Sequence, residues 1–164
     1  MSAARSPAEA WGEWDDVPKL TALHNYSRLR LHRSHLVDII THAREASPSE
    51  CCGLIGGTED GRTHSIYPLT NVALNTEVAY EAAPEQLFAA QRQMRQRGET
   101  LLAIYHSHPR ASEPTPSETD VRLAYYPSAT YLIVGLAGAA PAVRAFEISE
   151  HDHSWRKVEY DLSD

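Results

Sequence analysis

Two histidines and one aspartate are the residues of this sequence best suited to hold a metal ion. His106 and His108 stand two positions apart in Tyr105-His106-Ser107-His108-Pro109, at the end of a run suited to a strand. Side chains at positions i and i+2 of a strand point to one face, so the two imidazoles can converge on one ion. A catalytic zinc ion takes three protein ligands and keeps one position for water. Asp120, in the first turn of the following predicted helix, is the nearest candidate for the third ligand.

Each half of this pattern also has an ordinary structural interpretation. A His-x-His pair alone is more often solvent-facing or structural, and Ser117-x-x-Asp120 alone is typical of a helix capping box. The loop between the two halves carries Pro109, Pro114 and Pro116, which stiffen the chain. The combination is a narrower match than either half, because the same aspartate can begin the helix and face the metal.

The two halves, together with Glu50, resemble the signature of the JAMM (MPN-plus) metallopeptidases. The similarity runs from about Leu29 to about Leu162 and includes Glu-Cys-Cys-Gly-Leu-Ile-Gly-Gly (50–57) and Pro-Leu-Thr-Asn (68–71). It is strongest to the small bacterial branch, which includes hydrolases acting on adducts of ubiquitin-like sulfur-carrier proteins. The family usually places seven residues between the second histidine and the serine, whereas residues 109–116 make eight here. We expect this loop to absorb the extra residue.

The resemblance implies a role for each residue of the pattern. His106, His108 and Asp120 would hold one Zn²⁺ per chain, Glu50 would be the general acid/base, and Ser117 would help to hold the oxyanion. Zinc acidifies water and polarises a carbonyl, and a carboxylate within hydrogen-bond reach can carry the water's proton to the leaving amine. A donor to the oxyanion is typically worth about 2.7–4 kcal/mol. Without the histidine pair, Glu50 would be interpreted as a solvated glutamate after a helix.

The activity implied by the resemblance is zinc-dependent hydrolysis of an amide bond after the C-terminal Gly-Gly tail of a ubiquitin-like or sulfur-carrier protein. Such a reaction would release cysteine or another adduct. Two alternatives stay open. One is a peptidase of broader range, and the other is a catalytically silent MPN-type scaffold that only binds partner proteins. Scaffolds of that kind typically lose a zinc ligand or the glutamate, and this sequence retains all of them.

The remaining candidates for chemistry are weaker. Cys51 and Cys52 lie in a run that reads as a core strand, and buried cysteines are usually inert, so we expect neither to be a nucleophile. His151 and His153 stand between two predicted strands with acidic neighbours, which favours a solvated turn over a metal site.

The predicted elements alternate in a way typical of an α+β domain. The pattern predicts one mainly antiparallel sheet flanked by helices, and the resemblance implies an MPN/JAB-type, cytidine-deaminase-like fold. Helices are expected from Ser34 to near Pro48 with Leu36, Val37, Ile40 and Ala43 buried, from Pro84 to Gly98, and from Ser117 through Leu123. Strands are expected from Leu29, over 51–55, 63–70 and 101–105, and near 129–136, 142–149 and 155–160.

Composition and charge bound the remaining possibilities. The 164 residues fit one domain, which we place at 28–164, and residues 1–27, with Trp11 and Trp14, read as a flexible N-terminal extension. The formal net charge of -7 argues against a nucleic-acid partner, which needs a clustered basic surface. The two adjacent cysteines and the lack of a long apolar stretch favour a cytoplasmic protein without a membrane segment.

Overall fold

A computed structural model describes residues 28–164 of the chain. The predicted extension over residues 1–27, including Trp11 and Trp14, lies outside the described residues.

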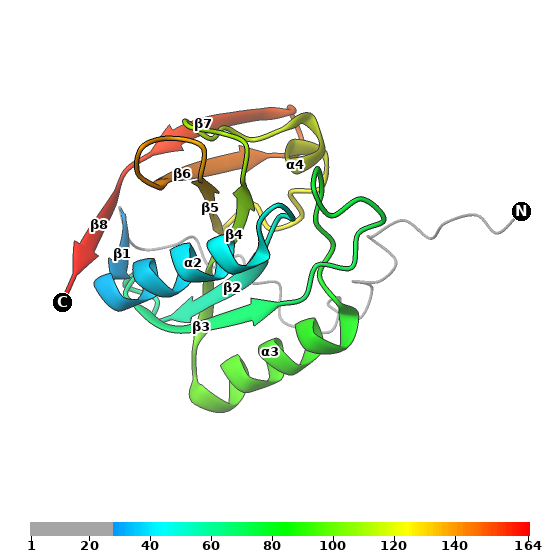
Figure 1. The fold of residues 1–164 in the computed structure, drawn as a ribbon. Helices are drawn as coiled ribbons and strands as arrows, with labels where there is room; N and C mark the ends of the chain where they lie inside the picture. The colour runs from blue at the N-terminus through cyan, green and yellow to red at the C-terminus, as the bar shows by residue number, and fades with distance from the viewer. Residues whose placement is uncertain (1–27) are drawn as a thin grey trace, which may run out of the picture.

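A six-stranded sheet forms the centre of the described chain (Figure 1). Its strand order is β3-β2-β4-β5-β6-β7, and every neighbouring pair is antiparallel except β4 with β5. The predicted α+β class and mainly antiparallel sheet are therefore confirmed. The strands are β2 (Cys52–Gly57), β3 (Thr63–Leu69), β4 (Thr100–His108), β5 (Thr130–Gly135), β6 (Ala142–Ser149) and β7 (Ser154–Val158).

The parallel pair at the middle of the sheet determines where the histidines end up. Parallel neighbours cannot be joined by a tight turn, so the chain leaves the end of β4 at His108 and returns to β5 through a long crossover. This crossover contains the short helix α4 (Glu118–Arg122). Asp120 is therefore carried by the segment that begins where the two histidines end.

Two helices of 14 residues pack on opposite faces of the sheet (Figure 1). The buried residues of α2 (Arg33–Ala46), Ile39 and Ala43, belong to a core cluster with Tyr105. Those of α3 (Pro84–Arg97) pack on the other face in a cluster with Leu54, Ile104 and Tyr131; they are Leu87, Ala90 and Met94. Gly98 ends α3 in the left-handed conformation (φ 67°), which a residue without a Cβ adopts at little cost.

Helix α2 differs from its prediction in its N-cap and in its buried face. His32, rather than Ser34, is the N-cap, since its ring accepts a hydrogen bond from the Ser34 main-chain N–H. Val37, predicted to be buried, is 62% exposed, Leu36 and Ile40 are only partly buried, and Ile39, which was not predicted, is fully buried. At 100° per residue, Val37 lies well away from the stripe of Ile39 and Ala43, so it cannot share their contact with the sheet.

The C-terminal segment also differs from its prediction. The single strand expected near 155–160 is two strands, β7 and β8 (Tyr160–Ser163). After Val158 the chain leaves β6, and β8 pairs in parallel with β1 (Leu29–His32) in a separate two-stranded sheet. No glycine or proline marks the change of partner at Glu159, so the hydrophobic pattern could not reveal it.

The loop that follows the histidines packs tightly against the sheet. The main chain of Ala137 donates a hydrogen bond to the Ala111 carbonyl oxygen (3.0 Å). A Cβ on Gly135 would stand 2.5 Å from that same oxygen, so a glycine is needed for this close approach. Pro114 and Pro116 are buried. Among residues 28–164, no helix has the length and apolar character that crossing a bilayer would require.

Candidate active site

The two histidines lie on one face at the end of β4. Main-chain pairing holds this strand end on both sides, because His106 is opposite Cys52 of β2 and Ile133 of β5. The side chain of His106 is fully buried and that of His108 is 16% exposed. Their Nε2 atoms are 3.1 Å apart. The convergence predicted from the i and i+2 spacing is therefore present.

Asp120 meets both histidines from the first turn of α4. Its Oδ2 atom lies 3.1 Å from Nε2 of His106 and 3.1 Å from Nε2 of His108. A capping box with Ser117 fixes the carboxylate: the Ser117 N–H donates to Asp120 Oδ2 (2.9 Å), and the Asp120 N–H donates to Ser117 Oγ (3.1 Å). Asp120 thus begins the helix and faces the histidines at the same time.

The three atoms form a triangle whose size suits a zinc ion. Within residues 28–164, His106, His108 and Asp120 are the one group of three His, Cys, Asp or Glu residues close enough to share an ion. A tetrahedral zinc ion with ligands at about 2.0–2.1 Å keeps neighbouring ligand atoms about 3.3 Å apart. The observed separations of 3.1 Å are close to that value, and the two-imidazole, one-carboxylate set is common at catalytic zinc. The residues therefore fit the metal that the sequence pattern implies.

Charge within the triangle keeps the carboxylate ionised. Burial alone would raise the pKa of Asp120, but the charge of His106 and hydrogen bonds from both histidines hold that pKa well below its usual range. Burial likewise acts to lower the pKa of His106, and the charge of Asp120 outweighs it, so this pKa is raised. An ionised carboxylate is the form that binds a metal, and metal binding at His106 would displace its proton.

Glu50 borders the triangle from the segment between α2 and β2. Its side chain is 7% exposed, and its Oε1 atom lies 3.9 Å from Nε2 of His108. Burial raises the pKa of this carboxyl, while the two histidines act in the opposite direction. The solvated glutamate that the sequence also allowed is therefore not what the structure shows. A buried carboxyl beside the triangle is within reach of a water or substrate atom placed there.

Ser117 lies beside Asp120, at the exposed start of α4. Its Oγ accepts the Asp120 N–H, which leaves the hydroxyl proton available to donate. The extra residue in the 109–116 loop does not move this helix start away from the histidines, because the Ser-x-x-Asp spacing still places Asp120 Oδ2 against both imidazoles. All five residues singled out from the sequence are thus brought to one place.

Two further residues contribute to the site, although the sequence pattern assigned neither of them a role. The ring of Tyr80 stacks on the His106 imidazole, with centroids 4.7 Å apart and an interplanar angle of 30°. Ser107, between the two histidines, points the other way and accepts the Cys51 N–H with its Oγ (2.8 Å), which ties the histidine segment to the residue after Glu50. Tyr80 lies in a segment without helical or strand period, so only its three-dimensional position reveals the contact.

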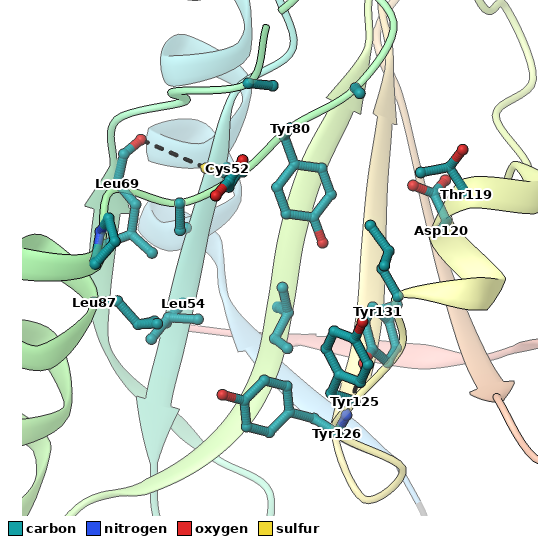
Figure 2. Close-up of a pocket in the computed structure, with 18 of the residues that line it drawn as sticks. Cys52, Leu54, Leu69, Tyr80, Leu87, Thr119, Asp120, Tyr125, Tyr126 and Tyr131 are labelled. Carbon is teal, nitrogen blue, oxygen red and sulfur yellow. Dashed lines mark hydrogen bonds between the residues drawn. The ribbon is translucent and has the colours of Figure 1, made fainter. Parts of the chain in front are cut away.

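A largely apolar cavity of about 330 Å³ adjoins the triangle (Figure 2). Its wall includes Asp120, which belongs to the triangle, and Tyr80, which stacks on His106. The remaining wall comes from both the sheet and its covering elements, and includes Leu54, Leu69, Leu87, Ile104, Leu123 and Tyr131. The candidate site is therefore polar at the triangle and apolar beside it.

Neither the Cys51 nor the Cys52 thiol belongs to the metal-ligand group, although Cys52 lines the adjoining cavity. Both are buried free thiols, and burial raises the pKa of Cys51 to about 11 and that of Cys52 to about 12. A thiol with such a pKa is almost entirely protonated at neutral pH, so it is a poor nucleophile. His151 and His153 lie exposed in the turn between β6 and β7, apart from the triangle.

Comparison with known proteins agrees with the fold. The sequence profile described as prokaryotic homologs of the JAB domain matches residues 32–149. A protein of Haloferax volcanii named desampylase is 38% identical over 121 residues, which cover 71% of this chain and 86% of the relative. The CysO-cysteine peptidase of Mycobacterium tuberculosis is 38% identical over 104 residues, which cover 62% of this chain and 70% of the relative. A solution structure of a Desulfitobacterium hafniense protein superimposes with a TM-score of 0.72 at 34% identity, over 83% of this chain and 93% of that one.

Proposed function

This chain belongs to the prokaryotic homologs of the JAB domain, and on that premise we propose that it is a zinc metallopeptidase acting on conjugates of small carrier proteins. The bond cleaved is the amide after the C-terminal Gly-Gly tail of a ubiquitin-like or sulfur-carrier protein. The names of the two relatives, a desampylase and a CysO-cysteine peptidase, support a hydrolase of this class.

One observation carries the proposal. Three ligand atoms stand 3.1 Å from one another, and a buried carboxylate oxygen of Glu50 lies 3.9 Å from one of them. A catalytically silent scaffold has no need for a buried glutamate beside a metal-ligand triangle, because burying an ionisable group costs free energy. The scaffold alternative is therefore the weaker one.

The residues divide the work of hydrolysis between them. A zinc ion held by His106, His108 and Asp120 would polarise the scissile carbonyl and make a water molecule more acidic. Glu50 accepts a proton from the attacking water as the new C–O bond forms, and it returns that proton to the amine nitrogen as the C–N bond breaks. The Ser117 hydroxyl donates a hydrogen bond to the carbonyl oxygen as negative charge develops there. The products are a free carboxyl-terminal tail and a free amine.

The test is turnover of a defined conjugate. Purified protein with stoichiometric zinc is incubated with a sulfur-carrier protein extended by cysteine, or by a short peptide, after its Gly-Gly end. Mass spectrometry follows the loss of the extension. We expect cleavage directly after the second glycine, and no cleavage after treatment with a strong zinc chelator.

Two controls separate the alternatives. The same carrier with Gly-Gly changed to Ala-Ala tests whether the tail is recognised, and an unstructured peptide without a carrier tests for a broader peptidase. Equal cleavage of all three substrates would point to broad specificity. Binding of carriers without cleavage of any of them would favour the scaffold and contradict the proposal.

A further inference from the structure

The loop between β3 and α3 holds the main chain of Glu50 on both sides. We refer to residues 71–82 as the 71–82 loop. The Glu50 N–H donates to the Thr76 carbonyl oxygen (2.7 Å), and the Asn71 side-chain Nδ2 donates to the Glu50 carbonyl oxygen (2.9 Å). Next to them, the hydroxyls of Ser49 and Thr76 lie 2.7 Å apart. Both main-chain polar groups of Glu50 therefore depend on this loop, not on a neighbouring strand.

Asn71 also gives the loop its shape. Besides Glu50, its Nδ2 donates to the Ala79 carbonyl oxygen (2.9 Å), and its Oδ1 accepts the N–H groups of Ala73 (3.0 Å) and Glu81 (3.1 Å). Two donated and two accepted bonds use the capacity of one side-chain amide. The two ends of the loop close against each other by a bridge between Asn71 and Ala82.

Two substitutions separate the bonds that this amide donates from those that it accepts. Aspartate has the same shape and accepts as well, but an ionised carboxylate cannot donate to Glu50 or Ala79. Alanine removes all four bonds. The contact with Glu50 thus depends on the donor group of the amide, which neither substitution retains.

We propose that Asn71 is the positioning residue of the general acid/base, an inference that rests on the proposed hydrolase function. It acts through Glu50: the bond to the Glu50 carbonyl oxygen fixes the main chain from which the carboxylate extends toward the triangle. Proton transfer needs heavy atoms within about 2.6–3.2 Å, and a displacement of about 1 Å can cost about 10²-fold in rate. Asn71 is neither a metal-ligand candidate nor a lining residue of the cavity, although its hydrogen bonds also hold Ala79 and Glu81, which do line it.

The first experiment compares Asn71→Ala and Asn71→Asp with a matched control, Gln86→Ala. Gln86 makes two side-chain hydrogen bonds to Thr70, the residue before Asn71, but none to Glu50. We expect both Asn71 variants to lose about 10- to 100-fold in kcat with unchanged zinc content and a KM within about twofold of wild type. The control should keep its kcat. A merely structural role predicts instead that Asp, which keeps both accepted bonds, is much the milder change.

A double-mutant cycle identifies the group through which Asn71 acts. In the Glu50→Gln background, Asn71→Ala should cost less than about twofold in residual kcat, because the proton carrier is already absent. An equal fold-loss of kcat in both backgrounds, or a raised KM with an unchanged kcat, would overturn the inference.

Crystal structures of the zinc-loaded Asn71→Asp and Gln86→Ala proteins test the inference without any substrate. We expect the Glu50 carboxylate to move by about 1 Å or more in the first and to stay in place in the second. An unmoved Glu50 in Asn71→Asp would overturn the inference whichever conjugate the enzyme cleaves. Failure of the wild type to cleave carrier conjugates would contradict the proposed function alone.

Discussion

The aromatic ring of Tyr80 lies stacked on the imidazole of His106, with 4.7 Å between ring centroids. Metal-bound histidines usually donate their second ring nitrogen to an acceptor, a contact that a ring stacked on the imidazole face does not provide. His106 Nδ1 is buried and has no hydrogen-bond partner among residues 28–164. Packing against Tyr80 therefore helps to orient the His106 ring, together with the contacts of its Nε2 atom with His108 and Asp120.

Tyr80→Ala is predicted to weaken zinc binding by about 10-fold, the lower end of what loss of an outer contact to a metal ligand costs. Removing the ring frees the His106 imidazole to rotate away from the triangle. Competition with a chromophoric chelator measures the affinity. Tyr80→Phe is the matched control, since it keeps the stacked ring and should bind zinc as the wild type does. Equal affinity in the alanine variant would show that Tyr80 does not orient His106.

His106→Ala and His108→Ala are each predicted to abolish tight binding of the single zinc ion. Two remaining protein ligands leave the coordination shell too open. Elemental analysis of purified protein gives the stoichiometry, which we expect to be about one for the wild type and near zero for each variant. His151→Ala, in the exposed turn between β6 and β7, serves as control and should keep the full metal content. A variant lacking both His106 and His108 that still holds stoichiometric zinc would contradict the site.

Cys51→Ser and Cys52→Ser are each predicted to keep most of the kcat per folded molecule. With pKa values raised to about 11 and about 12, both thiols stay protonated at neutral pH and become reactive only as the pH rises toward those values. Iodoacetamide should therefore label the native protein far more slowly than the unfolded chain at pH 8. Burying a hydroxyl costs about 1–3 kcal/mol in stability, so lower melting temperatures are expected. Loss of turnover in a folded, zinc-loaded variant would indicate a thiol role.

Ser117→Ala is predicted to have two separable effects. Loss of the N-cap should lower the free energy of unfolding by about 1 kcal/mol, and loss of the donor to the oxyanion should lower kcat by about 10²–10³-fold. Ser117→Thr retains both the capping oxygen and the hydroxyl proton, so it should keep most of the wild-type stability and most of the wild-type kcat. Chemical denaturation and steady-state kinetics measure the two quantities. A stability loss with an unchanged kcat would restrict Ser117 to its capping role.

The sequence allowed the grouping of His106, His108 and Asp120 to be predicted because local rules govern each part of it. His106 and His108 share a face by strand alternation, and Asp120 follows Ser117 by the spacing of a capping box. The contact between Asp120 and the two histidines across the crossover is a tertiary contact. No local pattern predicts it; the family resemblance implied it, and the structure shows separations of 3.1 Å.

Other features could not be predicted from the sequence because they depend on long-range contacts without a local pattern. Tyr80 and Asn71 lie in or at the end of an irregular segment, where the meaning of a side chain depends on what packs against it. The exposure of Val37 and the division of the C-terminal strand at Glu159 also depend on long-range contacts. The sheet determines which face of α2 is buried, and β1 is the strand with which β8 pairs.

The central claim is that Glu50 carries the proton at a zinc-dependent hydrolytic site, and Glu50→Gln tests it most directly. The amide keeps the size of the side chain but cannot accept the proton of water. Wild type and variant are compared for zinc content, carrier binding and release of the extension from a Gly-Gly-extended carrier protein. The account predicts unchanged zinc and binding with a kcat lower by at least about 10²-fold, the usual contribution of a general acid/base. A fully zinc-loaded Glu50→Gln protein that cleaves the carrier at the wild-type rate would contradict it.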